Sequence, residues 1–382
     1  MWQIYFQPRS VSEAVELLAQ YGGDARIVNG GTDLIFDLEN RLRTPRVLID
    51  VSRIPGLDTI RTDGDYVRMG ASVTLDQAIA SQILRDEAYL LPSACWSMGV
   101  PQVRSRATVA GNLITASPSN DCIASLWAMG AEVKLKSVRG ERVVAFTDFF
   151  KDVRQTAMEP DEMLVEISCS RMTYKDRGAY VRLGWNRQVD KALPNVGVVL
   201  EFEDDEISNA WINLGGVAST VVNAIDAEQS LVGQWLNDGA IDEAAELAMN
   251  AVQWGGGRGK LVPEMVGHAL RQIRDNTFEL PPVPALMWGD SGHLHLREPV
   301  VGLYRTAVGD VIEANINGEI YSATTEGKTL LQMLRDDLHL MNIPKCSDGV
   351  CGKCMVLLDG VAAMSCLVPA PRAHRAQVVV GV

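Results

Sequence analysis

Four cysteines near the end of the 382-residue chain constrain its fold more than any other feature. They are Cys346, Cys351, Cys354 and Cys366. The chain holds seven cysteines, an odd number, and the remaining three are scattered: Cys95, Cys122 and Cys169. This distribution argues against a disulfide framework, and the clustering of four thiols in one short segment predicts a metal site.

The spacing of the cluster is C-x4-C-x2-C, and eleven residues separate Cys354 from Cys366. Plant-type ferredoxins bind a 2Fe–2S cluster with this spacing. Gly349 and Gly352 let the loop backbone curl closely around such a cluster because they lack a Cβ atom. The following "MVLLDGVAAMSC" predicts a hairpin with its turn at Asp359-Gly360, and the return strand brings back the fourth thiol.

Structural zinc is the alternative occupant of these thiols. Zinc sites usually combine two C-x2-C pairs or include histidine. This segment has one C-x2-C pair, and His339 and His374 do not stand at zinc-ligand spacing. The spacing therefore favours iron–sulfur over zinc.

The segment before the cysteines, "VIEANINGEIYSATTEGKTLLQMLRDDL", predicts a strand, a turn at Asn317-Gly318, a second strand and a helix from about Lys328. Together with "CSDGVCGKC", "LLDG" and "SCL", it resembles the ferredoxin-like domain of the molybdenum hydroxylase family. That family includes xanthine dehydrogenase and aerobic carbon monoxide dehydrogenase. The resemblance runs from about residue 311 to the end, and it implies a β-grasp domain whose four cysteines ligate one 2Fe–2S cluster.

Two glycine-containing loops mark the first part of the chain. "RIVNGGTDLIFDL", residues 26–38, predicts a strand end, a sharp turn at Asn29-Gly30-Gly31 and a helix capped by Thr32 or Asp33. Successive backbone N–H groups in such a turn suit a pyrophosphate, although an ordinary strand–turn–helix connection has the same sequence. A second loop, within residues 106–131, also leads from a Gly-Asn turn into a helix.

With "FQPRSVSEAVELLAQYG", "VRMGASVTLDQ" and "DEMLVEI", these loops resemble the FAD-binding subunit of the same family over roughly residues 1–200. The resemblance implies the two-part FAD-binding fold of the PCMH type, shared with vanillyl-alcohol-oxidase-like flavoproteins. It also implies which residues contact FAD: Ile27, Val28, Asn29, Gly30, Gly31, Thr32, Asp33, Leu34, Thr108, Val109, Ala110, Gly111, Asn112, Asp121, Leu164 and Arg182. Ala110 stands where the family pattern more often has glycine, and a negative φ would tolerate its methyl group.

A Rossmann fold is not expected to hold the FAD, because the chain has no G-x-G-x-x-G motif. "GGGRGK", residues 255–260, fits neither that motif nor a Walker loop. No NAD motif is present, but the flavin family binds NAD without a Rossmann signature, so NAD stays open as an electron acceptor.

We expect an α+β chain with three domains. The FAD-binding domain spans 1–175, and a small α+β domain, the C-terminal domain of the flavin subunit, spans 176–280. In the latter, "IDEAAELAMNAV" and "PEMVGHALRQIRD" predict amphipathic helices. Residues 281–310 are rich in Pro and Gly and predict a linker, and the 2Fe–2S ferredoxin-type domain follows at 311–382.

Charge and hydropathy exclude several other classes. The net charge of −13 and the pI near 4.9 argue against a nucleic-acid partner, which would need a basic face. No apolar run is long enough to span a bilayer, and "MWQIYFQPRS" does not have the pattern of a signal peptide. We therefore expect a cytoplasmic protein whose thiols stay reduced.

The resemblance to the molybdenum hydroxylase family implies an oxidoreductase chain that serves as the electron-transfer subunit of such an enzyme. The family's molybdenum domain and its second 2Fe–2S domain are not found in this sequence, so we expect a molybdenum-cofactor-binding large subunit, and a chain with the second cluster, as partners. The final acceptor would be NAD, quinone, ferredoxin or oxygen. We assign no catalytic residues to this chain, since the cofactors carry this chemistry. The alternatives are a free-standing FAD/2Fe–2S reductase without molybdenum and an assembly subunit with an empty flavin site.

Overall fold

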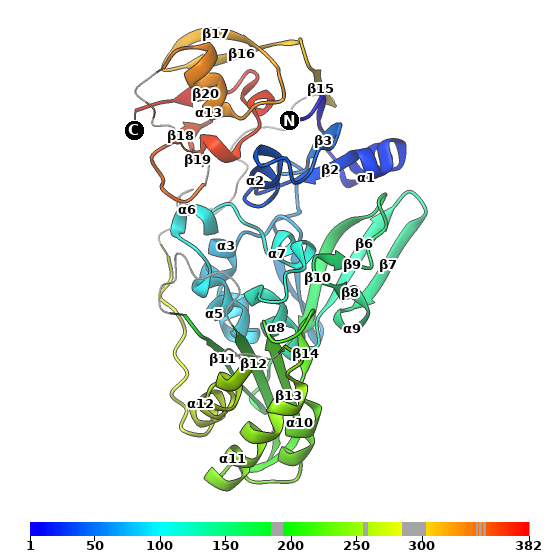
Figure 1. Cartoon of the computed structure of the whole chain (residues 1–382), viewed down its shortest axis with the longest axis vertical. Coiled ribbons are helices and arrows are strands. Elements are labelled where there is room, and N and C mark those ends of the chain that lie inside the picture. Colours follow the sequence, from blue (N-terminus) through cyan, green and yellow to red (C-terminus); the bar gives the residue numbers. More distant parts are fainter. Residues whose placement is uncertain are drawn as a thin grey trace.

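The structure is a computed structural model that describes residues 1–184, 194–254, 259–284, 303–340, 343, 346 and 349–381. It is a mixed α/β chain in which four sheets of four or five strands follow one another along an elongated molecule (Figure 1). The N-terminal and C-terminal sheets lie together at one end, and the helices α10–α12 lie at the other. In the part of the chain that is described, no helix has the length and apolarity to cross a bilayer.

The first sheet has the order β15-β1-β3-β2. Its strands are β1 (Ile4–Gln7), β2 (Ala25–Val28), β3 (Val47–Asp50) and β15 (Tyr304–Ala307), and its helices are α1 (Val11–Tyr21) and α2 (Leu34–Glu39). Strands β1, β3 and β2 are parallel, as the α1 crossover requires. Helix α1 begins at Ser10, whose side chain accepts a hydrogen bond from the Glu13 N–H.

The second sheet is antiparallel and has the order β4-β5-β10-β6-β7. Its strands are β4 (Ile60–Asp63), β5 (Tyr66–Gly70), β6 (Glu132–Ser137), β7 (Gly140–Ala145) and β10 (Met163–Ser170). The associated short elements are α3 (Leu75–Ala80), α4 (Gln82–Glu87), α5 (Leu90–Ser97), α6 (Pro101–Arg104), α7 (Val109–Thr115), α8 (Asp121–Ala128), α9 (Phe146–Phe149), β8 (Phe150–Asp152) and β9 (Gln155–Thr156). These helices and the sheet enclose the largest apolar core of the described chain.

The third sheet is also antiparallel, with the order β11-β12-β13-β14. It comprises β11 (Asp176–Arg182), β12 (Asn195–Glu203), β13 (Glu206–Gly215) and β14 (Val222–Asn223), and it packs against α10 (Ile225–Leu231), α11 (Asp238–Leu247) and α12 (Val262–Arg274). The two amphipathic helices predicted in this region correspond to α11 and α12. The apolar side chains of α12 recur at helical spacing and are buried against the sheet.

The C-terminal sheet has the order β17-β16-β20-β18-β19. Its strands are β16 (Val311–Ile316), β17 (Glu319–Thr324), β18 (Met355–Leu358), β19 (Val361–Met364) and β20 (Gln377–Val379), and β16 pairs with β20 in parallel. Both predicted hairpins form, and both turn residues of Asn317-Gly318 and of Asp359-Gly360 have positive φ. The predicted helix begins after Thr329 as α13 (Leu330–Gln332) and continues as a π-turn over Met333–Asp337.

Part of the stretch expected to be a linker, 281–310, is a strand. β15 pairs antiparallel with β1, with Ile4 opposite Ala307 and Gln7 opposite Tyr304. A four-residue edge strand carries little periodicity, and its partner lies about three hundred residues away in the chain. Residues 285–302 of the expected linker lie outside the described residues.

The C-terminal sheet shares one apolar core with the N-terminal sheet. Trp2, Tyr5 and Leu48 pack in the same cluster as Leu330 and Leu367. The backbone is joined there as well, because the N-terminal ammonium donates to the Gly327 carbonyl at 2.8 Å. An ion pair of 3.0 Å links Arg53 to Asp359. The two sheets are therefore packed together as one body.

Candidate functional site

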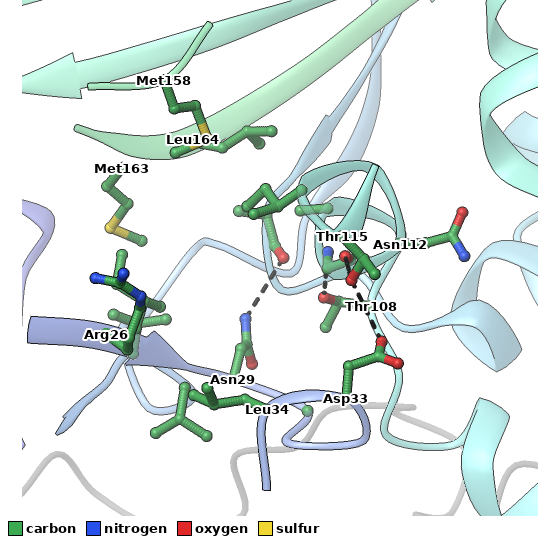
Figure 2. Close-up of a pocket in the computed structure, with 18 of the residues that line it drawn as sticks. Arg26, Asn29, Asp33, Leu34, Thr108, Asn112, Thr115, Met158, Met163 and Leu164 are labelled. Atoms are coloured by element: carbon green, nitrogen blue, oxygen red, sulfur yellow. Dashed lines mark hydrogen bonds between the residues drawn. The ribbon is translucent and has the colours of Figure 1, made fainter. Parts of the chain in front are cut away.

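A cavity of about 470 Å³ opens between the β2–α2 turn, helix α7 and strand β10 (Figure 2). Both glycine-containing loops predicted from the sequence contribute to its wall. The predicted FAD residues that line it are Ile27, Val28, Asn29, Gly30, Gly31, Thr32, Asp33, Leu34, Thr108, Ala110, Gly111, Asn112 and Leu164. The folding of the chain thus brings together residues that the resemblance picked from three separate segments.

The first loop needs glycine at two successive positions. A Cβ atom on Gly30 would lie 2.1 Å from the backbone oxygen of Arg106. Gly31 has a φ of 79°, and a Cβ atom there would lie 2.7 Å from the backbone oxygen of Leu367. The turn therefore approaches two other backbone segments. One is Arg106 in the second loop, and the other is Leu367 in the part of the chain from residue 311 onward, which we call the C-terminal unit.

Asn29 offers an open hydrogen-bonding position beside this turn. Its amide nitrogen donates to Ser72 Oγ at 2.8 Å, whereas its buried Oδ1 has no partner among the described residues. A buried carbonyl oxygen without a donor is costly, so this atom fits a ligand that supplies an N–H or O–H.

The expected cap of α2 is not made by a side chain. Asp33 is the N-cap residue by position, but its carboxylate makes no capping hydrogen bond and instead accepts from Thr115 Oγ1 at 3.4 Å. Figure 2 shows this link as a dashed line between the two side chains. The link ties the first loop to helix α7 of the second loop.

The second loop forms the short helix α7. Thr108 is its N-cap and accepts from the Gly111 N–H at 3.0 Å. Ala110 lies inside the helix, buried and without a positive φ, so its methyl group fits where the family pattern more often has glycine. The side chain of Asn112 points away from Thr108 and Thr115 and donates to Met98 Sδ (Figure 2). Val109 faces the core instead of the cavity.

Apart from Leu164, the residues of the opposite wall carried no signal in the sequence that pointed to FAD. Met158 and Met163 line the cavity there, beside the predicted Leu164, and Arg26 lies close to Met163 (Figure 2). Burial, followed by the charge of Arg43, lowers the pKa of Arg26. A half-buried guanidinium next to apolar side chains suits a phosphate or the face of an aromatic ring. Met163 adjoins Leu164 in "DEMLVEI", the one signal that could have identified it.

Two further predicted residues, Asp121 and Arg182, do not line this cavity but meet each other. Arg182 Nε lies 2.9 Å from Asp121 Oδ1, and the Tyr180 hydroxyl donates to the same oxygen at 2.5 Å. Burial raises the pKa of Asp121 to about 6, against the opposing effects of Arg182 and Tyr180. Across the β11–β12 pair, the buried Oδ1 of Asn195 has no partner among the described residues. Tyr180 and Asn195 carried no signal in the sequence.

The four late cysteines come together as the spacing predicts. Their Sγ atoms lie 3.4 Å apart between Cys346 and Cys351 and 3.3 Å apart between Cys354 and Cys366, and 3.9 Å separates Cys346 from Cys366. The contact between these two thiols lowers the pKa of Cys354 and raises the pKa of Cys366, so Cys354 ionises more readily than its neighbour.

The loop between these thiols needs its glycines. Gly349 and Gly352 have φ values of 68° and 74°. A Cβ atom on Gly349 would lie 2.8 Å from the Leu367 side chain, and one on Gly352 would lie 3.2 Å from Gln102 Nε2. The cysteine loop thus packs against the segment that leads to the second FAD-type loop.

The arrangement of the thiols bears on the choice between zinc and iron–sulfur. Cys346, Cys354 and Cys366 have Sγ atoms within 4.8 Å of one another, and Cys351 falls outside that group. One tetrahedral zinc with Zn–S bonds of about 2.3 Å would hold all four Sγ atoms about 3.8 Å apart. Cys346 belongs to this group of three and also contacts Cys351 at 3.4 Å, so the positions of the thiols do not separate one metal ion from two. Among the described residues, neither His339 nor His374 joins the group.

Comparisons with known proteins identify the family to which the first two thirds of the chain are similar. Residues 1–169 match the family model "FAD binding domain in molybdopterin dehydrogenase", and residues 179–260 match "CO dehydrogenase flavoprotein C-terminal domain". The carbon monoxide dehydrogenase medium chain of Afipia carboxidovorans is 34% identical, and the match covers 64% of this chain and 84% of the relative. This chain belongs to the FAD-binding medium subunits of the molybdenum hydroxylase family.

Other members agree with this assignment. The nicotine 6-hydroxylase medium subunit of Paenarthrobacter nicotinovorans is 30% identical over 65% of this chain and 87% of the relative. The solved carbon monoxide dehydrogenase of Hydrogenophaga pseudoflava superposes with a TM-score of 0.69 at 30% identity, covering 72% of this chain and 98% of the other. Because these relatives are subunits of dehydrogenases and hydroxylases, this medium subunit is a component of an oxidoreductase.

Proposed function

We propose that this medium subunit binds FAD and one 2Fe–2S cluster and passes electrons between them within a single chain. The observation that supports this most directly is the contact between the two sites. Leu367 follows the ligand candidate Cys366 in the chain, and its carbonyl oxygen packs against Gly31. Gly31 belongs to the first glycine-containing loop, residues 26–38, which we call the flavin loop. This contact packs the segment that follows the cysteine ligand directly against the first glycine-containing loop.

The cavity fits an extended FAD. The unpartnered Asn29 Oδ1 and the glycine turn beside it suit the polar part of the cofactor, and Met158, Met163 and Leu164 supply an apolar wall. Asp121, Arg182 and Tyr180 form a second polar group that we assign to the same cofactor. When bound, FAD supplies one- and two-electron chemistry, and the protein positions and tunes it.

The four cysteines have the spacing of a plant-type ferredoxin, and the mixed C-terminal sheet with its parallel pair β16 and β20 supports assignment to a β-grasp domain. We therefore assign residues 311–382 to a ferredoxin-type domain, residues 1–175 to a PCMH-type FAD domain and residues 176–280 to the C-terminal domain of the flavin subunit. β15 makes the end of the intervening segment part of the FAD domain.

The source and destination of the electrons lie outside this chain. Relatives are named as medium chains of carbon monoxide dehydrogenase, and one solved relative is a Cu,Mo-containing enzyme. By this similarity we propose a molybdenum-containing large subunit as the electron donor, with a chain bearing a second 2Fe–2S cluster between the two. The acceptor would then be NAD, quinone, ferredoxin or oxygen at the flavin.

Cofactor content tests the proposal. The purified chain is expected to hold two irons, acid-labile sulfide and one FAD, as a 2Fe–2S flavoprotein must. Cys351→Ser, at the most exposed of the four thiols, should lose iron but keep FAD, whereas Cys169→Ala in the apolar core should keep both. Zinc in place of iron, or iron that survives in Cys351→Ser at wild-type level, would contradict the assignment.

A further inference from the structure

Two arginines meet at one buried carboxylate on the edge of the cavity. The carboxylate belongs to Asp37 in helix α2, which is only 8% exposed. Arg43, which follows α2, donates from Nε to Asp37 Oδ2 at 2.9 Å. Arg154, in the turn between β8 and β9, lies 4.0 Å from Asp37 Oδ1. All three residues line the cavity.

Backbone hydrogen bonds fix both arginines beside the two glycine-containing loops. The Leu42 N–H donates to the Asp37 carbonyl oxygen at 2.8 Å, which ties the residue before Arg43 to helix α2. The Arg154 N–H donates to the carbonyl oxygen of Ala116 at 2.9 Å, directly after helix α7. Helices α2 and α7 belong to the two loops that wall the cavity, so both guanidinium groups are held within reach of a ligand there.

The group of three carries positive charge in surplus. One cation balances a buried carboxylate, and Asp37 has two. The side chains of Arg43 and Arg154 remain 42% and 53% exposed. An arginine has five N–H donors in a planar fork. Arg43 uses one of them on Asp37, and the Arg154 side chain makes no hydrogen bond to the described residues, so most of these donors are open to a ligand.

A phosphate group suits this arrangement. Arginine forks bind phosphate oxygens through paired, charge-assisted hydrogen bonds. The buried Asn29 Oδ1 lines the same cavity and has no partner among the described residues, so it suits an N–H or O–H donor of the same ligand. A nucleotide combines phosphate with hydroxyl and amine donors.

We propose that Arg43 and Arg154, held by Asp37, form a clamp for a phosphate group of a nucleotide. The inference rests on the proposed function, because the clamp lies on the cavity assigned to FAD. The phosphate can come from two sources. One is the pyrophosphate of FAD itself, and the other is a diffusible dinucleotide that takes up electrons beside the bound flavin. Both present anionic phosphate oxygens to the same donors.

Isothermal titration calorimetry with inorganic pyrophosphate tests the clamp on the full chain, in an FAD-loaded and an FAD-depleted sample. Pyrophosphate should bind the FAD-depleted wild type, and Arg43→Gln and Arg154→Gln should each weaken this binding at least about tenfold. Arg171→Gln is the matched control. Arg171 is 39% exposed and pairs with Glu87 at 3.0 Å, but it does not line the cavity, so its loss should leave binding unchanged.

The FAD-loaded sample identifies the source of the phosphate. If FAD itself occupies the clamp, pyrophosphate should bind only the FAD-depleted chain, and both variants should release FAD faster than the wild type on dilution. If a diffusible dinucleotide occupies it, pyrophosphate should bind both samples alike, and FAD release should not change.

The inference would be overturned if pyrophosphate bound neither sample, or if it bound the wild type and both variants equally. An equal loss of binding in Arg171→Gln would overturn it too. A wild-type chain that is purified without FAD, and that still binds pyrophosphate through Arg43 and Arg154, would instead refute the proposed function and leave the clamp standing.

Discussion

Alanine at Gly31 should destabilise the chain through its contact with the C-terminal unit. The left-handed φ of 79° costs a residue with a Cβ atom about 1–2 kcal/mol. The new methyl group would also lie 2.7 Å from the backbone oxygen of Leu367, and relief of such overpacking costs about 1–3 kcal/mol. Together, the free energy of unfolding should fall by about 2–5 kcal/mol.

Gly56 offers a closely matched control. Its φ is 80°, and a Cβ atom there would meet nothing within 4 Å. Gly56→Ala therefore carries the backbone strain and the entropy change of the unfolded chain without the contact, at a cost of about 1–2 kcal/mol. The difference between the two variants isolates the Leu367 contact.

Urea unfolding, followed by circular dichroism and by tryptophan fluorescence, measures this difference. Gly31→Ala should unfold at a clearly lower urea concentration than Gly56→Ala and should lose FAD on gel filtration. Equal midpoints for the two variants would refute the view that the flavin loop is packed against the C-terminal unit.

Three further predictions concern separate parts of the chain. The folded-state pKa of Asp121, about 6, lies above its ordinary value of 3.8, so this group favours the folded state most below pH 4 and loses that effect as the pH rises through 6. The free energy of unfolding of the wild type, relative to that of Asp121→Asn, should therefore increase by about 2–3 kcal/mol from pH 7 to pH 4. A difference that does not change with pH would contradict the buried position of this carboxyl group. Leu48→Ala should lower the free energy of unfolding by about 2–5 kcal/mol and should destabilise both the N-terminal and the C-terminal sheets, which share its core. Leu231→Ala, in the core of the third sheet, should leave cluster binding intact. Loss of iron from Leu231→Ala alone would contradict the shared core. At the cavity, Met163→Glu should weaken FAD retention at least about tenfold because it buries a charge in the apolar wall, and unchanged FAD content would count against this wall as a flavin contact.

The local features of the fold could be predicted from the sequence. The Asn-Gly and Asp-Gly turns both required positive φ at two positions, which these residue types tolerate best, and both hairpins form there. Helices α11 and α12 followed from apolar residues at helical spacing. The thiol cluster followed from spacing within one short loop, since nearby ligands leave the chain few ways to place them.

Long-range placement could not be predicted from these patterns. The pairing of β15 with β1, the contact of Gly31 with Leu367 and the hydrogen bond from Arg106 to Gly30 join segments that are far apart in the chain. Such contacts depend on how whole sheets pack, and no local propensity encodes them. Asp121 and Arg182 were each singled out only through resemblance to the family; their contact with each other was not predicted, and their partner Tyr180 had no signal at all.

The central claim is that electrons pass between a 2Fe–2S cluster and FAD inside one chain, and flash photoreduction of the purified protein tests it most directly. After a flash delivers less than one electron per chain under anaerobic conditions, the cluster and flavin absorbance should exchange at a rate that does not change with protein concentration. A rate proportional to protein concentration, or no exchange between the two absorbances, would contradict the account.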